Sequence, residues 1–442
     1  MNLAYFQMLL QESIDNATST QDLLSLSQAL EKLLLGQIRT VATYTLLPNA
    51  ATNEGLLVFV TADERLYWST GSLWYSIVTD NRAYAWSWGC NVSGQLGTYD
   101  TTSRSSPVSV VGGFSDWCNM SGGCIHNVTV RTNGTTWTWG DNTAGELGDN
   151  TTTTRSSPVS VVGGFTDWCQ ASAGVDHTVA VRTSGSAWAW GCNSGGRLGD
   201  NSTTNRSSPV SVVGGFTNWC QVSAGLQHTV GIRSNGTAWA WGCNFPNVLG
   251  TGYGTTTSSP VSVVGGFTDW CQISASHCHT HATRTNGTIW GWGQNGNSRL
   301  GDNTTTDRSS PVSVVGGFTN WCGVSAAISH GVGIRTNGSV WSWGFGDVGR
   351  LGDGTTVQKS SPVSVVGGFT DWCRISANLY HVGALRTNGT TWLWGCNGQG
   401  RLGDNTTTDR SSPVSVVGGF SDWCQVAVGG LHTLALRIDD FV

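Results

Sequence analysis

The feature that most constrains this chain is a repeat of fixed length. One proline recurs every 51 residues, at Pro107, Pro158, Pro209, Pro260, Pro311, Pro362 and Pro413. One histidine recurs at the same interval, at His126, His177, His228, His279, His330, His381 and His432. Self-similarity at a fixed period of this size is typical of a closed or stacked repeat architecture. Seven copies without drift therefore say more about the shape of the molecule than about its function.

The pattern within one repeat predicts four β-strands. In the second copy, apolar residues bounded by turn residues place strands at 158–162, 167–173, 178–182 and 186–191. Most copies join the last two strands by Asn-Gly, as at Asn133-Gly134, which favours a type I′ hairpin with positive φ at both turn residues. Four strands in each of seven repeats predict an all-β fold, a seven-bladed β-propeller.

The two ends of the repeat region predict how the ring closes. Residues 82–438 span seven repeats of 51 residues, and both ends of this span fall at the same hairpin turn. We therefore expect the strand at 84–89 to be the last strand of the final blade, with the preceding strands coming from the C-terminus. Such closure removes exposed sheet edges. The predicted propeller domain is 82–442.

Tryptophan and cysteine occupy repeated positions. Of the 23 tryptophans, 21 lie in the repeats, and pairs such as Trp137 and Trp139 face the same side of one strand, so we assign them to the core. Because the cysteine total of 13 is odd, the thiols cannot all pair within one chain, and we interpret them as small buried apolar side chains. Seven of them directly follow a tryptophan: Cys118, Cys169, Cys220, Cys271, Cys322, Cys373 and Cys424.

The segment before the repeats differs in character. Residues 1–39 are predicted to form a helical anchoring or oligomerisation segment, because Leu23, Leu26, Leu30 and Leu33 make an apolar seam. A seam this short must pack on a partner chain, on a larger assembly or on the chain's own domain. Residues 40–81 contain short β-rich runs at 56–61 and 65–69, which predict a small β adaptor.

Composition excludes several classes of partner. Charged residues make up only 11% of the chain, and the net charge of −5 gives no electrostatic footprint for nucleic acid or for an anionic membrane surface. No apolar run is long enough to span a bilayer, so we expect no membrane insertion. The N-terminus lacks the basic region of a secretory signal.

The repeat resembles that of a known family. The pattern GxxHT…RTNGTxWxWGxNxxGxLGDNTTTxRSSPVxV over residues 82–438 is similar to the repeat of the regulator of chromosome condensation family, a seven-bladed propeller. That resemblance implies an exchange factor for a small GTPase, a plant ultraviolet photoreceptor or a bacterial β-lactamase inhibitor. Fold alone does not choose among these activities.

Particular residues weigh against each implied activity. The exchange factor also binds chromatin, and this acidic chain has no basic tail for DNA phosphates. The photoreceptor signature places Trp-Arg before the repeat His-Thr, where this chain has Val175-Asp176 and Leu226-Gln227. The inhibitor is secreted, and no export signal is visible. What remains is a rigid platform for display.

A second resemblance concerns the predicted adaptor. The pattern LLPNAATNEGLLVFV…LYWSTGSLWYSI is similar to a short module of tailed-phage virion proteins, notably those of cyanophages, where it lies between a helical segment and a variable C-terminal domain. This resemblance implies that residues 1–80 contact other virion proteins. The propeller would then lie on the particle surface.

Candidate chemical sites are few. We expect the seven repeat histidines to be half-buried and to bond to a neighbouring strand. As an alternative, His277, His279 and His281 alternate on one strand face, with Cys278 opposite, and could hold zinc or copper. Repeated Asp–Arg pairs, such as Asp149 with Arg155, bracket the polar loops and tie each loop to itself or to the next blade. No nucleophile elbow, phosphate-binding loop or catalytic carboxylate pair is present, so we expect no enzyme and no cofactor.

Recognition is expected where the repeats depart from their own consensus. Exposed aromatic residues on the loops of a rigid scaffold are typical recognition elements, although drift among copies also produces departures. The departures lie at 245–254, 345–348 and 357–359. The candidate residues are Phe245, Pro246, Asn247, Tyr253, Phe345 and Lys359.

These observations favour a non-enzymatic structural protein of a tailed-phage virion. It would be made in the host cytoplasm without a signal peptide and would display the propeller as a tail fibre, tip or capsid decoration. Loops of the propeller would contact a receptor on the host surface. The alternative is a soluble protein-binding propeller that acts as an inhibitor or scaffold, and a third hypothesis is a metal-dependent or light-sensing protein. A homo-oligomer is compatible with each hypothesis.

Overall fold

The computed structural model describes residues 39–41, 57–60, 65–69, 74–76 and 83–438. Before the repeats, four strands form one sheet in chain order: β1 (Arg39–Val41), β2 (Leu57–Val60), β3 (Arg65–Ser69) and β4 (Trp74–Ser76). The first pair is parallel and the others are antiparallel. The helical segment predicted at 1–39 lies outside the described residues except for Arg39, which is the first residue of β1. The role of residues 40–81 as an adaptor stays a prediction.

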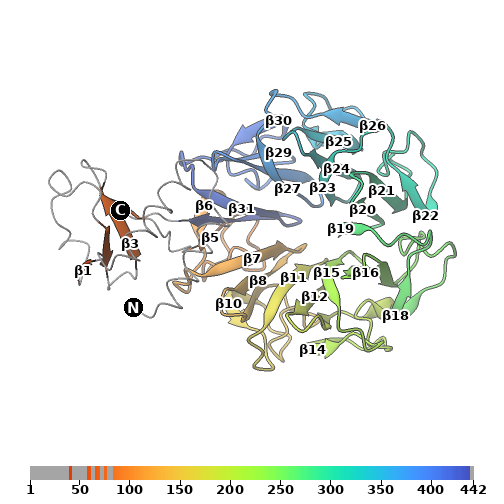
Figure 1. Cartoon of the computed structure of the whole chain (residues 1–442), viewed down its shortest axis with the longest axis horizontal. Helices are drawn as coiled ribbons and strands as arrows, with labels where there is room; N and C mark the ends of the chain where they lie inside the picture. The colour runs from red at the N-terminus through yellow and green to blue at the C-terminus, as the bar shows by residue number, and fades with distance from the viewer. Residues whose placement is uncertain (1–38, 42–56, 61–64, 70–73, 77–82, 439–442) are drawn as a thin grey trace. The chain divides into compact units, whose positions relative to one another are not determined.

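The repeats form a seven-bladed propeller of four-stranded sheets around a common centre (Figure 1), which confirms the predicted fold class. Blades 1 to 6 each use four consecutive strands, and blade 7 combines strands from both ends of the repeat region. Neighbouring strands of a blade run antiparallel, as in blade 2. No helix in the described part of the chain is long and apolar enough to cross a membrane.

In order of blades 1 to 7, the strands of each layer are as follows. The innermost strands are β7 (Trp117–Gly122), β11 (Trp168–Ala173), β15 (Trp219–Ala224), β19 (Trp270–Ala275), β23 (Trp321–Ala326), β27 (Trp372–Ala377) and β31 (Trp423–Val428). The second strands are β8 (His126–Arg131), β12 (His177–Arg182), β16 (His228–Arg233), β20 (His279–Arg284), β24 (His330–Arg335), β28 (His381–Arg386) and β32 (His432–Ile438).

The third strands are β9 (Thr136–Gly140), β13 (Ala187–Gly191), β17 (Ala238–Gly242), β21 (Ile289–Gly293), β25 (Val340–Gly344), β29 (Thr391–Gly395) and β5 (Ala83–Gly89). The outermost strands are β10 (Arg155–Ser160), β14 (Arg206–Ser211), β18 (Thr257–Ser262), β22 (Arg308–Ser313), β26 (Lys359–Ser364), β30 (Arg410–Ser415) and β6 (Arg104–Ser109). We call the connection between third and outermost strands the outer loop. Two outer loops contain a short 3-10 turn, η3 (Ser194–Gly196) and η4 (Asp347–Gly349).

Blade 7 closes the ring with two strands from each end of the repeat region. β5 pairs with β32 from Ala83↔Ile438 to Gly89↔His432, and β6 then pairs with β5. We predicted that only the 84–89 strand would come from the N-terminal side, and this is wrong. The proline-containing strand of every repeat is the outermost strand of the preceding blade, because it pairs with the third strand of that blade, which carries the tryptophan pair.

The hairpins between second and third strands also differ from the prediction. Gly134 has φ of 73° but Asn133 does not have a positive φ, so the turn is not type I′. The backbone N–H of Gly134 donates to the carbonyl of Arg131, and Asn133 Oδ1 accepts from the N–H of Thr135. A three-residue Thr-Asn-Gly loop with glycine in the left-handed region therefore makes the turn, which needs only one residue with positive φ.

The tryptophans pack between blades, as expected of a core. The last tryptophan of each third strand is fully buried, and Trp190 Nε1 donates to the carbonyl of Glu146 in the outer loop of the preceding blade at 2.8 Å. Trp168 on the inner strand lies with its ring centroid 6.0 Å from that of Trp190. The buried tryptophan of each third strand thus joins its blade to the preceding one, which is why the repeats stack as a ring.

The cysteines that follow the inner-strand tryptophans are not buried as predicted. Six of the seven are exposed, and Cys424 is half-buried. Cys169 lies at an irregularity in the pairing of β11 with β12, and its Sγ donates to the carbonyl of Val181 at 3.4 Å. The irregularity turns the thiol away from the packed face, so alternation along the strand did not reveal its exposure.

Candidate functional site

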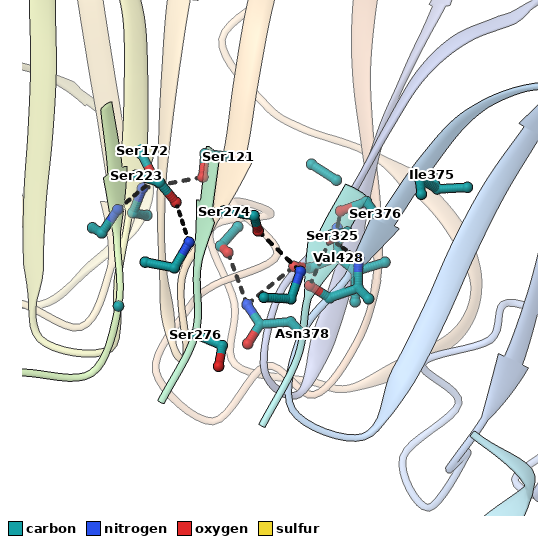
Figure 2. Close-up of a pocket in the computed structure, with 18 of the residues that line it drawn as sticks. Ser121, Ser172, Ser223, Ser274, Ser276, Ser325, Ile375, Ser376, Asn378 and Val428 are labelled. Carbon is teal, nitrogen blue, oxygen red and sulfur yellow. Dashed lines mark hydrogen bonds between the residues drawn. The ribbon is translucent and has the colours of Figure 1, made fainter. Parts of the chain in front are cut away.

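The inner strands leave one backbone edge facing a central channel, because only their other edge pairs with a second strand. Unpaired N–H groups on such an edge need acceptors. A serine from one blade supplies an acceptor to the next: Ser172 Oγ accepts from the N–H of Ala224 at 3.1 Å. Figure 2 shows these serines along the channel wall. The serine ring consists of Ser121, Ser172, Ser223, Ser274, Ser325 and Ser376.

A second ring, made of amide side chains two residues before the serines, also supplies hydrogen-bond acceptors to the N–H groups of the next blade. Gln170 Oε1 accepts from the N–H of Val222 at 3.0 Å, and its Nε2 donates to the carbonyl of the same residue at 2.9 Å. The four amides that accept in this way are Asn119, Gln170, Gln221 and Gln272. The next two positions of the ring are Gly323 and Arg374, which depart from the pattern.

The channel holds a cavity of about 730 Å³ whose lining includes serines, glutamines, Arg374 and Asn378, and none of the described residues that line it is a carboxylate. At the seventh position of the serine ring stands Ala427, which cannot accept a hydrogen bond. Asn378 acts at this closing interface instead, because its Nδ2 donates to the carbonyls of Gly122 and Val428, both at 3.2 Å (Figure 2). The inner wall is therefore polar, and on most of its circumference side chains hydrogen-bond to the unpaired edges of the innermost strands.

The repeat histidines form a structural ring, and they are fully buried where we expected them half-buried. His177 Nε2 lies 2.8 Å from Thr229 Oγ1 of the next blade, and burial lowers the pKa of His228 to about 3. Five of the seven bond to the next blade in this way: His126, His177, His228, His381 and His432.

The ring is interrupted at blades 4 and 5. The residue that His279 would reach in the next blade is Gly331, and His279 Nδ1 instead lies 2.8 Å from Ser276 Oγ. The corresponding residue for His330 is Val382, and neither ring nitrogen of His330 has a partner among the described residues.

The possible metal ligands do not come together as a site. His279 and His281 lie in the core with ring centroids 4.9 Å apart, whereas His277 precedes the strand and is half-buried beside the channel. Burial lowers the pKa of all three imidazoles. Across residues 83–438 and the four short strands before them, no three histidine, cysteine or acidic side chains are placed to hold a metal ion.

At the rim, most outer loops carry an ion pair that we call the rim latch. It joins an aspartate late in the loop to the first residue of the outermost strand that follows, so the predicted Asp–Arg pairs tie each loop to itself. In blade 1, Arg155 Nη2 lies 3.0 Å from Asp149 Oδ2. The six rim latches are Asp100–Arg104, Asp149–Arg155, Asp200–Arg206, Asp302–Arg308, Asp353–Lys359 and Asp404–Arg410.

The outer loop of blade 3 has threonines at both latch positions, Thr251 and Thr257, and displays two aromatic side chains. Phe245 is 84% exposed and Tyr253 is 58% exposed. Pro246 and Asn247, the other candidates in this loop, are half-buried. The base of the loop is held by Asn244, whose Oδ1 accepts from the N–H of Leu249 at 3.0 Å.

The candidates of blade 5 are engaged within their own blade. Lys359 Nζ lies 3.4 Å from Asp353 Oδ2, so it forms the ordinary rim latch. Phe345 is half-buried, with the guanidinium of Arg350 5.2 Å from its ring centroid. The loops of blades 3 and 5 are separated by blade 4. The six predicted residues therefore do not form one continuous site.

Sequence reasoning missed the departures at Gly323 and Arg374, which lie on the channel wall. The signal was present, because the column at intervals of 51 residues reads Asn, Gln, Gln, Gln, Gly, Arg, Gln. Only the structure shows that this column caps the edge of the next blade.

Comparison with known proteins gives one family. The model of the regulator of chromosome condensation (RCC1) repeat matches residues 84–130, 133–181, 184–232, 337–385 and 388–436, more than half of the chain. A second model of the same repeat matches residues 168–197.

Relatives and solved structures agree with that match. The chain is 29% identical over 331 residues to the ultraviolet-B receptor UVR8 of Arabidopsis thaliana, covering 72% of this chain and 74% of the receptor. Human WBSCR16 is similar in structure with a TM-score of 0.73 at 20% identity, over 81% of this chain and 100% of that one. Prp20p of Saccharomyces cerevisiae gives 0.72 at 17% identity, over 82% and 93%. At these identities, the two solved structures support the fold alone.

Proposed function

Because the chain belongs to the regulator of chromosome condensation (RCC1) repeat family, we propose that it is a non-enzymatic, protein-binding propeller that acts as a scaffold or inhibitor. Its partner would contact the face that carries the outer loops. The observation that carries this proposal is the outer loop of blade 3, which lacks the rim latch and exposes Phe245.

The blade 3 loop can present an apolar side chain, that of Phe245, to a partner from a rigid base. Val248 and Leu249 are buried and anchor the loop, while Phe245 in the same loop is 84% exposed. Burying a side chain of this size against a partner contributes roughly 1.5–3 kcal/mol. Large aromatic side chains dominate the energy of many interfaces. Little ordering of the loop is needed on binding, which lowers the entropic cost.

The relatives support a protein partner rather than a particular one. The work on Prp20p concerns binding to Gsp1p and histones, which is a property of that protein. UVR8 is named as an ultraviolet-B receptor. This chain has Val175-Asp176 and Leu226-Gln227 where the receptor signature has Trp-Arg, so we do not extend light sensing to it.

The test compares one side chain at two equivalent positions. Phe245 in blade 3 corresponds to Thr143 in blade 1. Partners would be cross-linked to the full chain in its native source and identified, and the purified partner would then be titrated against Phe245→Ala and Thr143→Ala. We expect Phe245→Ala to weaken binding at least about tenfold, or about 1.4 kcal/mol, and Thr143→Ala to leave it unchanged. Equal affinities for the two variants would exclude the blade 3 loop as the contact.

Membership of a phage virion remains a prediction, because it rests on residues 1–80, of which only β1 to β4 are described. None of the similar proteins named above is a virion protein. Mass spectrometry of purified particles would test this hypothesis directly, and absence of the chain from them would exclude it.

A further inference from the structure

The channel wall fails to satisfy its own edge in one sector, between blades 5 and 7. From blade 1 to blade 4, the amide ring caps one backbone N–H in each following blade, at Ala171, Val222, Ile273 and Val324. The next N–H groups in this series belong to Ile375 and Val426. The residues that should cap them are Gly323 and Arg374.

Neither of these residues is able to accept the hydrogen bond. Gly323 has no side chain, and the guanidinium of Arg374 carries only donors. The missing side chain also leaves a notch, because Ile375 is half-buried, whereas the equivalent Ile273 and Val324 are each only 2% exposed. Figure 2 shows Ile375 beside the channel, apart from the serine ring.

Arg374 brings an uncompensated positive charge to this notch. Its side chain is exposed and lines the cavity, and within residues 83–438 it takes part in no ion pair. The neighbouring thiol of Cys424 stays neutral, because burial raises its pKa to about 11. Among the described residues that line the cavity, the one imidazole is His277, and burial lowers its pKa, which keeps it uncharged at neutral pH. The described side chains that line this notch thus supply one positive charge and no carboxylate, and its backbone edge offers N–H groups beside carbonyls, as Val222 does in blade 3.

We infer that this notch, formed by Gly323, Arg374 and the edge N–H groups of Ile375 and Val426, binds a carboxylate. A carboxylate has two oxygens that accept in parallel from a guanidinium and further lone pairs for backbone N–H groups. The carboxylate belongs either to a small free acid or to an acidic side chain of a protein that enters the channel.

The experiment is a ligand-observed NMR titration of the full chain with two probes, succinate and a hexaglutamate peptide. Arg374→Gln and Gly323→Gln both install the residue that the repeat carries elsewhere. Gln221 lies opposite Ile232 in blade 3, and Gly323 lies opposite Ile334 in blade 5, where a Cβ at position 323 would lie 2.7 Å from Ile334 Cγ2, so the Ile334 side chain must shift to admit glutamine. Arg155→Gln is the control for net charge, and Phe245→Ala is the control for the loop of the proposed function.

We expect Arg374→Gln to weaken binding of the probe at least about tenfold and Gly323→Gln to weaken it several-fold, while both controls bind as the unaltered chain does. Succinate binding without peptide binding would identify a free acid as the ligand, and the reverse would identify a protein segment. The inference is overturned if neither probe saturates the unaltered chain, or if Arg374→Gln binds equally well. Thermal melting of each variant checks that the ring is intact. Loss of partner binding in Phe245→Ala tests the proposed function separately.

Discussion

The inner ring and the outer rim are built from the same repeat but distribute their polar contacts differently. In the ring, histidine, serine and glutamine side chains bond to residues 52 positions later, so each contact joins two blades. At the rim, a latch such as Asp149–Arg155 joins residues six positions apart within one loop. A change in one of these ring contacts therefore affects two blades, whereas a change in a rim latch affects one loop.

This difference decides how departures from the repeat should be interpreted. A buried polar group left without its partner costs about 1–3 kcal/mol, while an exposed ion pair contributes about 0–1 kcal/mol. Some departures in the interior come with compensation: His281 replaces the usual valine, and Gly291 on the paired strand replaces an alanine or larger residue. Uncompensated departures in the ring, such as Gly323 and Arg374, are therefore stronger evidence of function than departures at the rim.

Acidification should produce the largest difference between the two regions, because it destabilises the ring of buried histidines before it affects the rim latches. For buried histidines such as His228, His281 and His432, burial lowers the folded-state pKa to about 3, well below the usual 6.5. Their contribution is fully present above pH 6.5 and is lost as pH falls toward 3, about 2 kcal/mol for each histidine at pH 5. Burial lowers the pKa of five further imidazoles, those of His126, His177, His279, His330 and His381, so the chain should unfold above pH 4 when followed by circular dichroism.

Carboxylates provide the internal control for this acid transition. Hydrogen bonds from Thr151 and Arg155, opposed by burial, lower the pKa of Asp149 below its usual 3.8, so the rim latch is lost only below about pH 4. Burial raises the pKa of Glu146 to about 7, which stabilises the fold on acidification and offsets roughly one histidine. The variant His281→Val with Gly291→Ala should move the transition to lower pH. A transition below pH 4 that this variant does not shift would contradict the histidine explanation.

An isosteric pair of substitutions tests the ring one contact at a time. Thr229→Val removes the partner of His177 and should lower the free energy of unfolding by about 1–3 kcal/mol. Val382→Thr offers the unpartnered His330 a hydroxyl and should raise it by about 0.5–1.5 kcal/mol. Urea denaturation measures both. Changes of opposite sign in the free energy of unfolding would indicate that hydrogen bonding controls this interface. Loss of stability in both variants would mean that packing controls it.

The sequence was sufficient for features that depend on spacing and insufficient for those that depend on backbone direction. The period of 51 residues led to seven blades and to the strand at Ala83–Gly89 in the closing blade. The exposure of Cys169 and the hairpin geometry at Gly134 depend on irregularities that a repeat pattern does not encode. The unlatched loop around Phe245 was visible as a departure, but the channel notch depends on contacts between blades, which only the structure supplies.

The smallest expected effect lies at the rim, where the comparison is most easily broken. Arg155→Gln removes the 38% exposed cation of the blade 1 latch. It leaves the 4% exposed Asp149 carboxylate with its hydrogen bonds from Asn142 and Thr151, so it should lower stability by about 0.2–1 kcal/mol. Installing a latch in blade 3 by Thr251→Asp with Thr257→Arg should raise stability by a similar amount. Both effects should shrink at high salt, because screening weakens exposed pairs. If Arg155→Gln lowered the free energy of unfolding as much as Thr229→Val in the same urea titration, ring and rim contacts would be energetically equivalent. Substitutions in the exposed loop around Phe245 would then no longer be expected to have a small effect on stability.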